Sequence, residues 1–146
     1  MIPKIIHYCW FDHNPFNHKV QMCMETWHRL LPDYQFYFWN EANSPMNHPF
    51  VREAYKAKRY AFVADYVRIW ALYNYGGVYL DTDMYVIKSF DNLLLKNSFI
   101  CYQEVESINI NFCVVGCESK AAWIKELLDV YDSINYDDKI VQKLGY

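Results

Sequence analysis

The stretch "AFVADYVRIWALYNYGGVYLDTD", residues 61–83, contains the pattern that decides the fold. Between Ala61 and Tyr73 it is apolar or aromatic on nearly every side, which predicts a largely buried helix. The pair Gly76-Gly77 predicts the carboxyl end of that helix, because glycine readily takes the left-handed backbone of a helix cap. The residues after the pair predict a short strand. A helix that leads through a tight turn into a strand is a unit of an α/β fold.

The segments on either side extend this pattern. Residues 4–10 predict a buried first strand, residues 18–31 an amphipathic helix and residues 34–40 a second strand, an order that favours a parallel sheet with a right-handed crossover. Turn-forming residues predict an exposed loop over 40–49. The other expected elements are a short polar helix (50–59), a strand "MYVIKSF" (84–90), a turn of helix (91–95), two strands (98–104 and 110–116) and an amphipathic helix over 119–134 with Ser119 as its N-cap.

Composition sets the scale of the molecule. The 146 residues, 53% of them hydrophobic, are enough to bury the core of one domain spanning residues 1–146. We therefore predict a single α/β domain with a mostly parallel sheet. The 14 tyrosines and 5 tryptophans suit a ligand-binding cleft, because these side chains combine an apolar face with a polar edge; an aromatic-rich core is the alternative.

Charge and cysteine usage exclude other classes. A net charge of −3 without runs of Lys and Arg argues against nucleic acid as a partner. The five cysteines form no CxxC pair and predict reduced, buried thiols of a cytoplasmic protein. The first residues contain Lys4 and His7 and do not resemble a signal peptide, and we see no apolar run of the length that spans a bilayer. We expect a cytoplasmic protein, with peripheral contact to the inner face of the membrane left open.

Asp81 and Asp83 follow the short strand after the glycines. In open α/β sheets ligands bind outside the carboxyl ends of the strands, so these carboxylates are candidate ligands. Two like charges one residue apart need a cation or protonation to relieve their repulsion. Mg²⁺ and Mn²⁺ accept one or two carboxylates and keep other positions for water and phosphate oxygens, which predicts a metal that holds a diphosphate. A solvated surface turn is the alternative.

Asp65 and Arg68 are the charged residues of the expected buried helix. They lie three residues apart on one face, and burying a charge is costly unless it is paired or bound to a ligand. A structural Asp–Arg pair is one explanation. The other is a functional pair, in which Asp65 accepts hydrogen bonds from a ribose or base and Arg68 points at phosphate or sugar oxygens.

Three stretches together resemble a known family. "IPKIIHYCWF" (2–11), residues 61–83 and "YVIKSFDNLL" (85–94) are similar, in register over about residues 2 to 95, to glycosyltransferase family 32. This family includes capsular polysaccharide enzymes and yeast mannosyltransferases, and its core resembles the clostridial toxin glucosyltransferases. The sequence of an Asp-x-x-Arg helix, Gly-Gly and an acidic pair carries the resemblance.

The resemblance implies a GT-A fold and a hexosyltransferase that uses a UDP- or GDP-sugar donor, a divalent metal (Mn²⁺ or Mg²⁺) and retention of anomeric configuration. The acceptor would be a saccharide hydroxyl, on a growing polysaccharide or a lipid-linked oligosaccharide. The implied site residues are Trp10 near the base, Asp65 and Arg68 at the donor, Tyr79 lining the pocket, Asp81 at the ribose and metal, Asp83 as the direct metal ligand, and Asn109 or Asn111 beside the donor.

Two departures from the family pattern stand out. The sequence after Trp10 lacks the glycine-containing turn that relatives carry, so the loop over the base is expected to differ. Family members also usually continue beyond the last expected helix, which makes a truncated acceptor side an expectation. Two other functions stay open on the residues alone: a metal-dependent phosphohydrolase acting on nucleotides, and a non-catalytic remnant that binds the donor.

Overall fold

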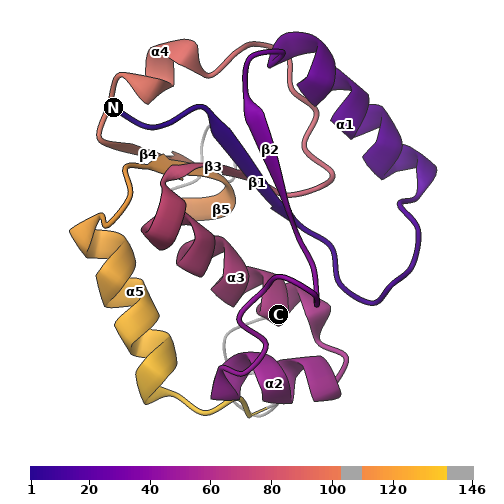
Figure 1. Ribbon diagram of the computed structural model, residues 1–146, viewed down its shortest axis with the longest axis vertical. Helices are drawn as coiled ribbons and strands as arrows, with labels where there is room; N and C mark the ends of the chain where they lie inside the picture. Colours follow the sequence, from indigo (N-terminus) through magenta and orange to yellow (C-terminus); the bar gives the residue numbers. More distant parts are fainter. Residues whose placement is uncertain (103–109, 138–146) are drawn as a thin grey trace.

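The computed structural model describes residues 1–102 and 110–137. Within these ranges ten elements follow one another (Figure 1). They are β1 (Ile5–Cys9), α1 (His18–Leu30), β2 (Gln35–Trp39), α2 (Pro49–Lys56), α3 (Tyr60–Tyr75), β3 (Gly77–Leu80), α4 (Asp91–Leu94), β4 (Ser98–Tyr102), β5 (Ile110–Cys117) and α5 (Ala122–Ser133).

The strands form one sheet in the order β2-β1-β3-β5-β4. β1 pairs in parallel with both β2 and β3, whereas β5 pairs antiparallel with β3 and with β4. The predicted α/β class is confirmed, with its parallel part in three neighbouring strands. Since these three strands run in one direction, their carboxyl ends meet at one edge, as the prediction of a site there requires.

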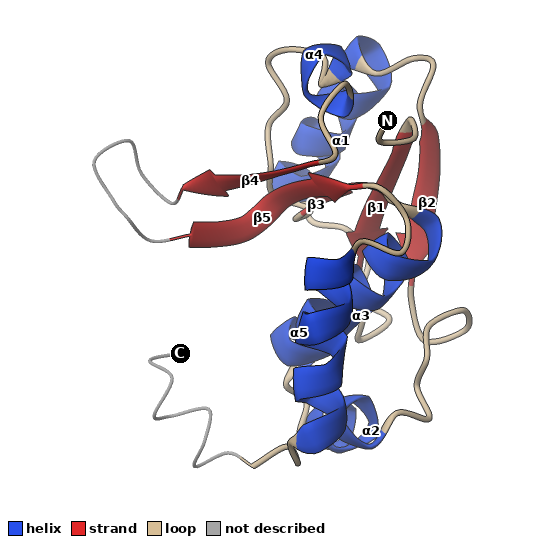
Figure 2. Ribbon diagram, turned by 90° about the vertical axis from the view of Figure 1, so that its left-hand side faces the viewer, coloured by secondary structure: helices blue, strands red, loops and turns tan. Residues whose placement is uncertain are grey.

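Helices cover both faces of this sheet (Figure 2). On one face Trp27 of α1 and Leu31, the residue after α1, pack against Ile6 of β1. Leu94 of α4 belongs to the same cluster. On the other face α2, α3 and α5 pack on a second cluster that includes Val67 of α3. The alternation of side chains along β1 divides the two cores, because neighbouring residues of a strand point to opposite faces.

The junction between α3 and β3 is built on glycine, as predicted. Gly76 has a φ of +65° and Gly77 a φ of +110°, backbone that other residues rarely adopt. A Cβ on Gly77 would lie 2.7 Å from the carbonyl oxygen of Ile5, so β1 could not pair so closely with β3.

His7 fastens this junction from the middle of β1. It is fully buried, and its Nδ1 accepts a hydrogen bond from Trp39 Nε1 at 3.1 Å. The other nitrogen, Nε2, therefore carries the proton and donates to the carbonyl oxygen of Gly76 at 2.7 Å. Burial lowers the pKa of His7 to about 4, since the charged form would lose its hydration. His7 is thus a neutral structural histidine.

The segment 84–90 is not the strand that its alternation predicts. Its backbone groups bind side chains of α1 instead of another strand: Val86 N donates to Thr26 Oγ1 at 2.9 Å, and Trp27 Nε1 donates to the carbonyl oxygen of Met84 at 2.7 Å. These bonds satisfy the buried polar groups that a sheet would otherwise satisfy. Alternation alone does not distinguish such a covering segment from a strand.

Ser119 is not the N-cap of the last helix. That position belongs to Ala121, which makes no side-chain cap. Lys120 takes a φ of +60°, and its N–H donates to the carbonyl oxygen of Tyr73 at 2.8 Å. The residues before α5 therefore form a turn tied to the end of α3, and the helix begins later than predicted.

The remaining predictions concern cysteines and membrane spans. All five cysteines are free, as expected, but only Cys9, Cys23 and Cys117 are buried; Cys101 and Cys113 are partly exposed. Within the described ranges, no helix combines the length and the apolar composition that crossing a bilayer requires.

Candidate functional site

Asp81 lies directly after β3, at the edge where the parallel strands end. Its N–H donates to the carbonyl oxygen of Cys113 in β5 at 2.9 Å, and its carbonyl oxygen accepts from Met84 N at 3.0 Å. The first bond continues the β3–β5 ladder by one residue and the second closes a turn. The backbone of Asp81 is therefore fixed on both sides, and its half-buried side chain leaves the sheet in a defined direction.

Arg68 of α3 joins Asp81 to Asp65. Its Nη2 lies 2.9 Å from Asp65 Oδ1 and 3.2 Å from Asp81 Oδ1, and its Nη1 donates to the carbonyl oxygen of Phe112 at 2.8 Å. Only 8% of Arg68 is exposed. We call Asp65, Arg68 and Asp81, with the Tyr79 ring and the Phe112 carbonyl, the Arg68 network. The structural Asp–Arg pair that the sequence left open is present, and it extends to the first aspartate of the acidic pair.

Tyr79 supports this network from below. Its ring centre lies 4.5 Å from Arg68 Cζ, in cation–π geometry. The side chain is 1% exposed, so it does not line an open pocket as expected. Burial raises the pKa of Tyr79 well above its ordinary range, which keeps the phenol neutral.

The electrostatics of the network are balanced between burial and pairing. Burial raises the pKa of Asp65 more than the positive charge of Arg68 lowers it. Burial alone would lower the pKa of Arg68, but the negative charges of Asp65 and Asp81 raise it, so that Arg68 stays charged. One buried cation thus holds two carboxylates, and removing it would leave both without compensation.

Asp83 differs from Asp81 in every one of these respects. Its side chain is 47% exposed and pairs with Lys19 Nζ of α1 at 3.3 Å. Such an exposed ion pair contributes little to stability and is readily exchanged. The structure fastens the first aspartate within the fold and leaves the second available at the surface.

These residues fit a hard divalent cation. Among residues 1–102 and 110–137, no group of three or more His, Cys, Asp and Glu side chains is placed to hold a metal by itself. Asp81 and Asp83 offer oxygen ligands, and Mg²⁺ or Mn²⁺ bound by one or two carboxylates completes its shell from water and phosphate. Arg68 Nε is buried without a hydrogen-bond partner in the described part of the chain, which leaves a donor for an anionic oxygen.

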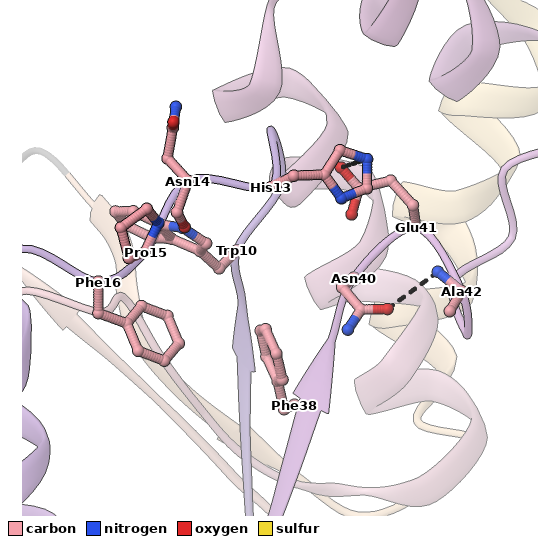
Figure 3. Close-up of a pocket in the computed structure, with 9 residues that line it drawn as sticks. All are labelled: Trp10, His13, Asn14, Pro15, Phe16, Phe38, Asn40, Glu41 and Ala42. Atoms are coloured by element: carbon pink, nitrogen blue, oxygen red, sulfur yellow. Dashed lines mark hydrogen bonds and ion pairs between the residues drawn. The ribbon is translucent and has the colours of Figure 1, made fainter.

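Trp10 follows β1 at the same edge of the sheet and borders two cavities. The smaller, of about 250 Å³, lies between the end of β1 and the start of α3, and is lined by Cys9, Trp10, Phe11, Asp12, Tyr60, Ala61 and Ala64. The larger, of about 550 Å³, is lined by Trp10, His13, Asn14, Pro15, Phe16, Phe38, Asn40, Glu41 and Ala42 (Figure 3). The charged side chains of the Arg68 network line neither cavity.

Residues 10–14, which we call the Trp10 loop, contribute to the lining of both cavities. Asp12 and His13 have φ values of +93° and +61°, so the loop is strained at two consecutive residues. Glu41 holds it: its Oε1 accepts from Asp12 N at 2.9 Å and from the hydroxyl of Tyr55 at 3.0 Å. The loop therefore takes its shape without the glycine whose absence the sequence revealed.

The predicted donor contacts of Asn109 and Asn111 have less support in the structure. Asn111 Oδ1 accepts from Cys113 N at 2.7 Å, so this side chain shapes the backbone of β5 locally. Asn109 lies outside the described residues. A role of Asn111 beside a ligand stays a prediction.

Glu41 and the backbone of residues 112–113 were missed in the sequence. Glu41 stands in a loop of turn-forming residues and has no signal of its own. The contribution of β5 depends on its antiparallel pairing beside β3, which strand prediction did not assign to a partner.

The matched sequence family covers the centre of this site. A model of the family described as "Glycosyltransferase sugar-binding region containing DXD motif" matches residues 17–100. That range includes four members of the Arg68 network and Asp83, whereas Trp10 and β5, with Phe112, lie outside it.

Two curated relatives and one solved structure add to this. An uncharacterized protein of Arabidopsis thaliana is 37% identical over 82 residues, covering 56% of this chain and 12% of that protein. Inositol phosphoceramide mannosyltransferase 3 of Schizosaccharomyces pombe is 34% identical over 98 residues, covering 64% of this chain and 27% of that protein. The chain thus spans less than a third of the length of these relatives.

The solved structure of PaToxG glycosyltransferase superimposes with a TM-score of 0.75 at 16% identity, covering 90% of this chain and 61% of that one. At this identity the likeness concerns the fold alone, and it confirms the expected GT-A architecture.

Proposed function

Because the chain belongs to the family of glycosyltransferase sugar-binding regions that contain a DXD motif, we propose that it is the donor-binding part of a hexosyltransferase. The reaction moves a hexose from a nucleoside diphosphate sugar to a hydroxyl of a saccharide acceptor. The observation that carries the proposal is the Arg68 network, which presents Asp81 at the carboxyl edge of the sheet, within the matched region.

The donor would lie along this edge. Its base fits the smaller cavity between Trp10 and the start of α3, where an aromatic ring gives an apolar surface for a flat heterocycle. We assign Asp65, the residue after Ala64 on α3, to accept hydrogen bonds from the ribose. Asp81 then comes next to the diphosphate.

Asp81 and Asp83 would hold a divalent cation at the diphosphate. When bound, the metal supplies positive charge that stabilises the leaving diphosphate. Arg68 keeps the Asp81 carboxylate oriented, and its unpartnered Nε faces no competing acceptor among the described residues. Because Arg68 is buried, it acts chiefly by positioning Asp65 and Asp81.

The chemistry to be supported is cleavage of the bond between the anomeric carbon and a phosphate oxygen. The bonding electrons leave with the diphosphate, and the acceptor oxygen forms the new bond to the same carbon. We infer retention of configuration, with the proton of the acceptor hydroxyl passing to the leaving phosphate oxygen. The chain's carboxylates then bind and orient the donor without forming a covalent bond to the sugar.

The relative from Schizosaccharomyces pombe is an inositol phosphoceramide mannosyltransferase. GDP-mannose is therefore the donor to test first, and a lipid-linked acceptor the acceptor class to test first. A lipid acceptor would bring the reaction to a membrane surface.

Calorimetric titration with GDP-mannose, UDP-glucose and UDP-galactose, each with Mn²⁺ and with EDTA, tests the proposal. We expect metal-dependent binding of one donor and slow release of its sugar. Release of inorganic phosphate without sugar would identify a phosphohydrolase instead. No binding of any nucleotide would leave a protein that shares the fold but not the activity.

A further inference from the structure

The larger cavity beside the Trp10 loop has no role in the donor site described above. It shares Trp10 with the smaller cavity and is bounded by the ends of β1 and β2 and the loops that follow them (Figure 3). Its volume of about 550 Å³ lies within the range of small-molecule sites in proteins.

Three aromatic rings form one wall of this cavity. Phe16 contacts Trp10 edge to face, with ring centres 5.3 Å apart, and it contacts Phe38 with ring centres 5.7 Å apart. All three side chains are only partly buried. Phe38 in turn stacks on Tyr8 of β1 at 5.2 Å, so the wall rests on the sheet and is held in place.

The opposite wall is polar and lacks a basic side chain of the kind that binds phosphate. Lys and Arg are absent from its lining residues. Asn40 Oδ1 accepts from Ala42 N at 2.9 Å, which fixes the amide and directs its nitrogen to the other side, as Figure 3 shows. Glu41 adds a carboxylate and His13 an imidazole to the same wall.

We infer that this cavity is a binding site for a neutral saccharide, distinct from the donor site. A pyranose ring has C–H faces that pack on aromatic rings, and hydroxyls at its edge that pair with amide and carboxylate groups. A phosphorylated ligand is disfavoured by Glu41 and by the lack of Lys and Arg in the lining. The saccharide's role as the acceptor rests on the proposed function; its binding does not.

The shared Trp10 loop would couple this site to the donor site. Trp10 borders both cavities, so a ligand on either side contacts the same ring. Occupying one cavity would restrict the loop and lower the entropy lost when the other is filled.

Three exposed alanines allow a matched test. Ala42 lines the larger cavity, Ala61 lines the smaller, and Ala57, the C-cap of α2, lines neither. Each is exposed, so replacement by tryptophan adds bulk without disturbing the core. Nuclear magnetic resonance titrations would follow the indole N–H of Trp10 as methyl α-mannopyranoside, methyl α-glucopyranoside or methyl β-galactopyranoside is added.

We expect at least one glycoside to bind the natural chain, with Ala42→Trp weakening it by at least about tenfold and Ala61→Trp and Ala57→Trp leaving it unchanged. GDP with Mn²⁺ should show the reverse dependence on Ala42 and Ala61. In the unsubstituted protein, intermolecular contacts should join sugar protons to the rings of Phe16 and Phe38.

Three results would overturn the inference: no glycoside binds, binding survives Ala42→Trp, or the sugar contacts other rings. Loss of nucleotide binding alone would count against the proposed function and leave the saccharide site standing.

Discussion

The Arg68 network and the Trp10 loop lie at the same edge of the sheet, but different interactions hold them. In the network a buried guanidinium joins two carboxylates and a backbone carbonyl. In the loop two residues take positive φ values, and they are held by a bond to the carboxylate of Glu41 and by the loop's own bonds to Asn14. The comparison teaches that the charged half of the site is set by the fold, whereas the aromatic half is set by a few bonds near the surface.

Replacing Arg68 should have the largest effect on stability. In Arg68→Ala, Asp65 and Asp81 would remain partly buried without their cation, and we expect the free energy of unfolding to fall by about 3 kcal/mol or more. Urea unfolding measures this loss. Asp12→Ala, a change in the loop, is the matched control and should cost less; equal losses would show that the network is no more integral to the fold than the loop.

Asp83→Ala should separate function from folding. Because this side chain is about half exposed, stability should change by no more than about 0.5 kcal/mol. Donor turnover in Mn²⁺ should fall at least about 100-fold, equivalent to about 2.7 kcal/mol. Lys19→Ala removes the same ion pair and should retain turnover. Full turnover in Asp83→Ala would refute the metal assignment.

The neutral His7 below the junction predicts a dependence on pH. Its folded pKa of about 4 lies below its ordinary value of 6.5, so the unfolded chain binds the proton first as pH falls. The stability from neutral His7 is complete above pH 6.5 and is lost between about pH 6.5 and pH 4.

Between pH 7 and pH 5 this loss should reach about 2 kcal/mol. Urea unfolding at both pH values, compared between the natural chain and His7→Gln, isolates the contribution, because the other titrating groups are common to both. An identical pH dependence in the variant would contradict a neutral buried imidazole.

Glu41 gives the smallest and most specific effect. Glu41→Ala should release the Trp10 loop and weaken GDP binding by about tenfold, or about 1.4 kcal/mol. Glu41→Gln keeps an oxygen for Asp12 N–H and the Tyr55 hydroxyl, so it should restore most of the affinity. If alanine and glutamine behave alike, the charge facing His13 matters more than the hydrogen bonds.

The sequence predicted those parts of the fold that depend on local patterns. The buried helix, its glycine end and the strand before Asp81 were predicted correctly because each has a strong signal of its own. Residues 84–90 and Ser119 were misjudged because tertiary bonds replaced the expected local ones. In both places the backbone found partners on a helix distant in the sequence.

The same division holds for the candidate site. Asp65 and Arg68 stood out as charges in an apolar helix, and their pairing follows from helical spacing. That Arg68 also reaches Asp81 and Phe112 depends on how α3 packs across the sheet. The contact of Tyr79 with Arg68 and the hydrogen bond from Tyr55 to Glu41 could not be predicted from spacing, because each joins residues of separate elements.

The antiparallel pairing of β5 has a consequence for how the protein is made. Arg68 and Asp81 each bind a carbonyl oxygen of β5, which leaves the ribosome after both of them. A nascent chain that ends at residue 100 would already contain the whole matched family region, yet its guanidinium and β3 edge would still be open. Fragments cut at the end of the matched region should therefore expose these groups and be targets for proteases and chaperones.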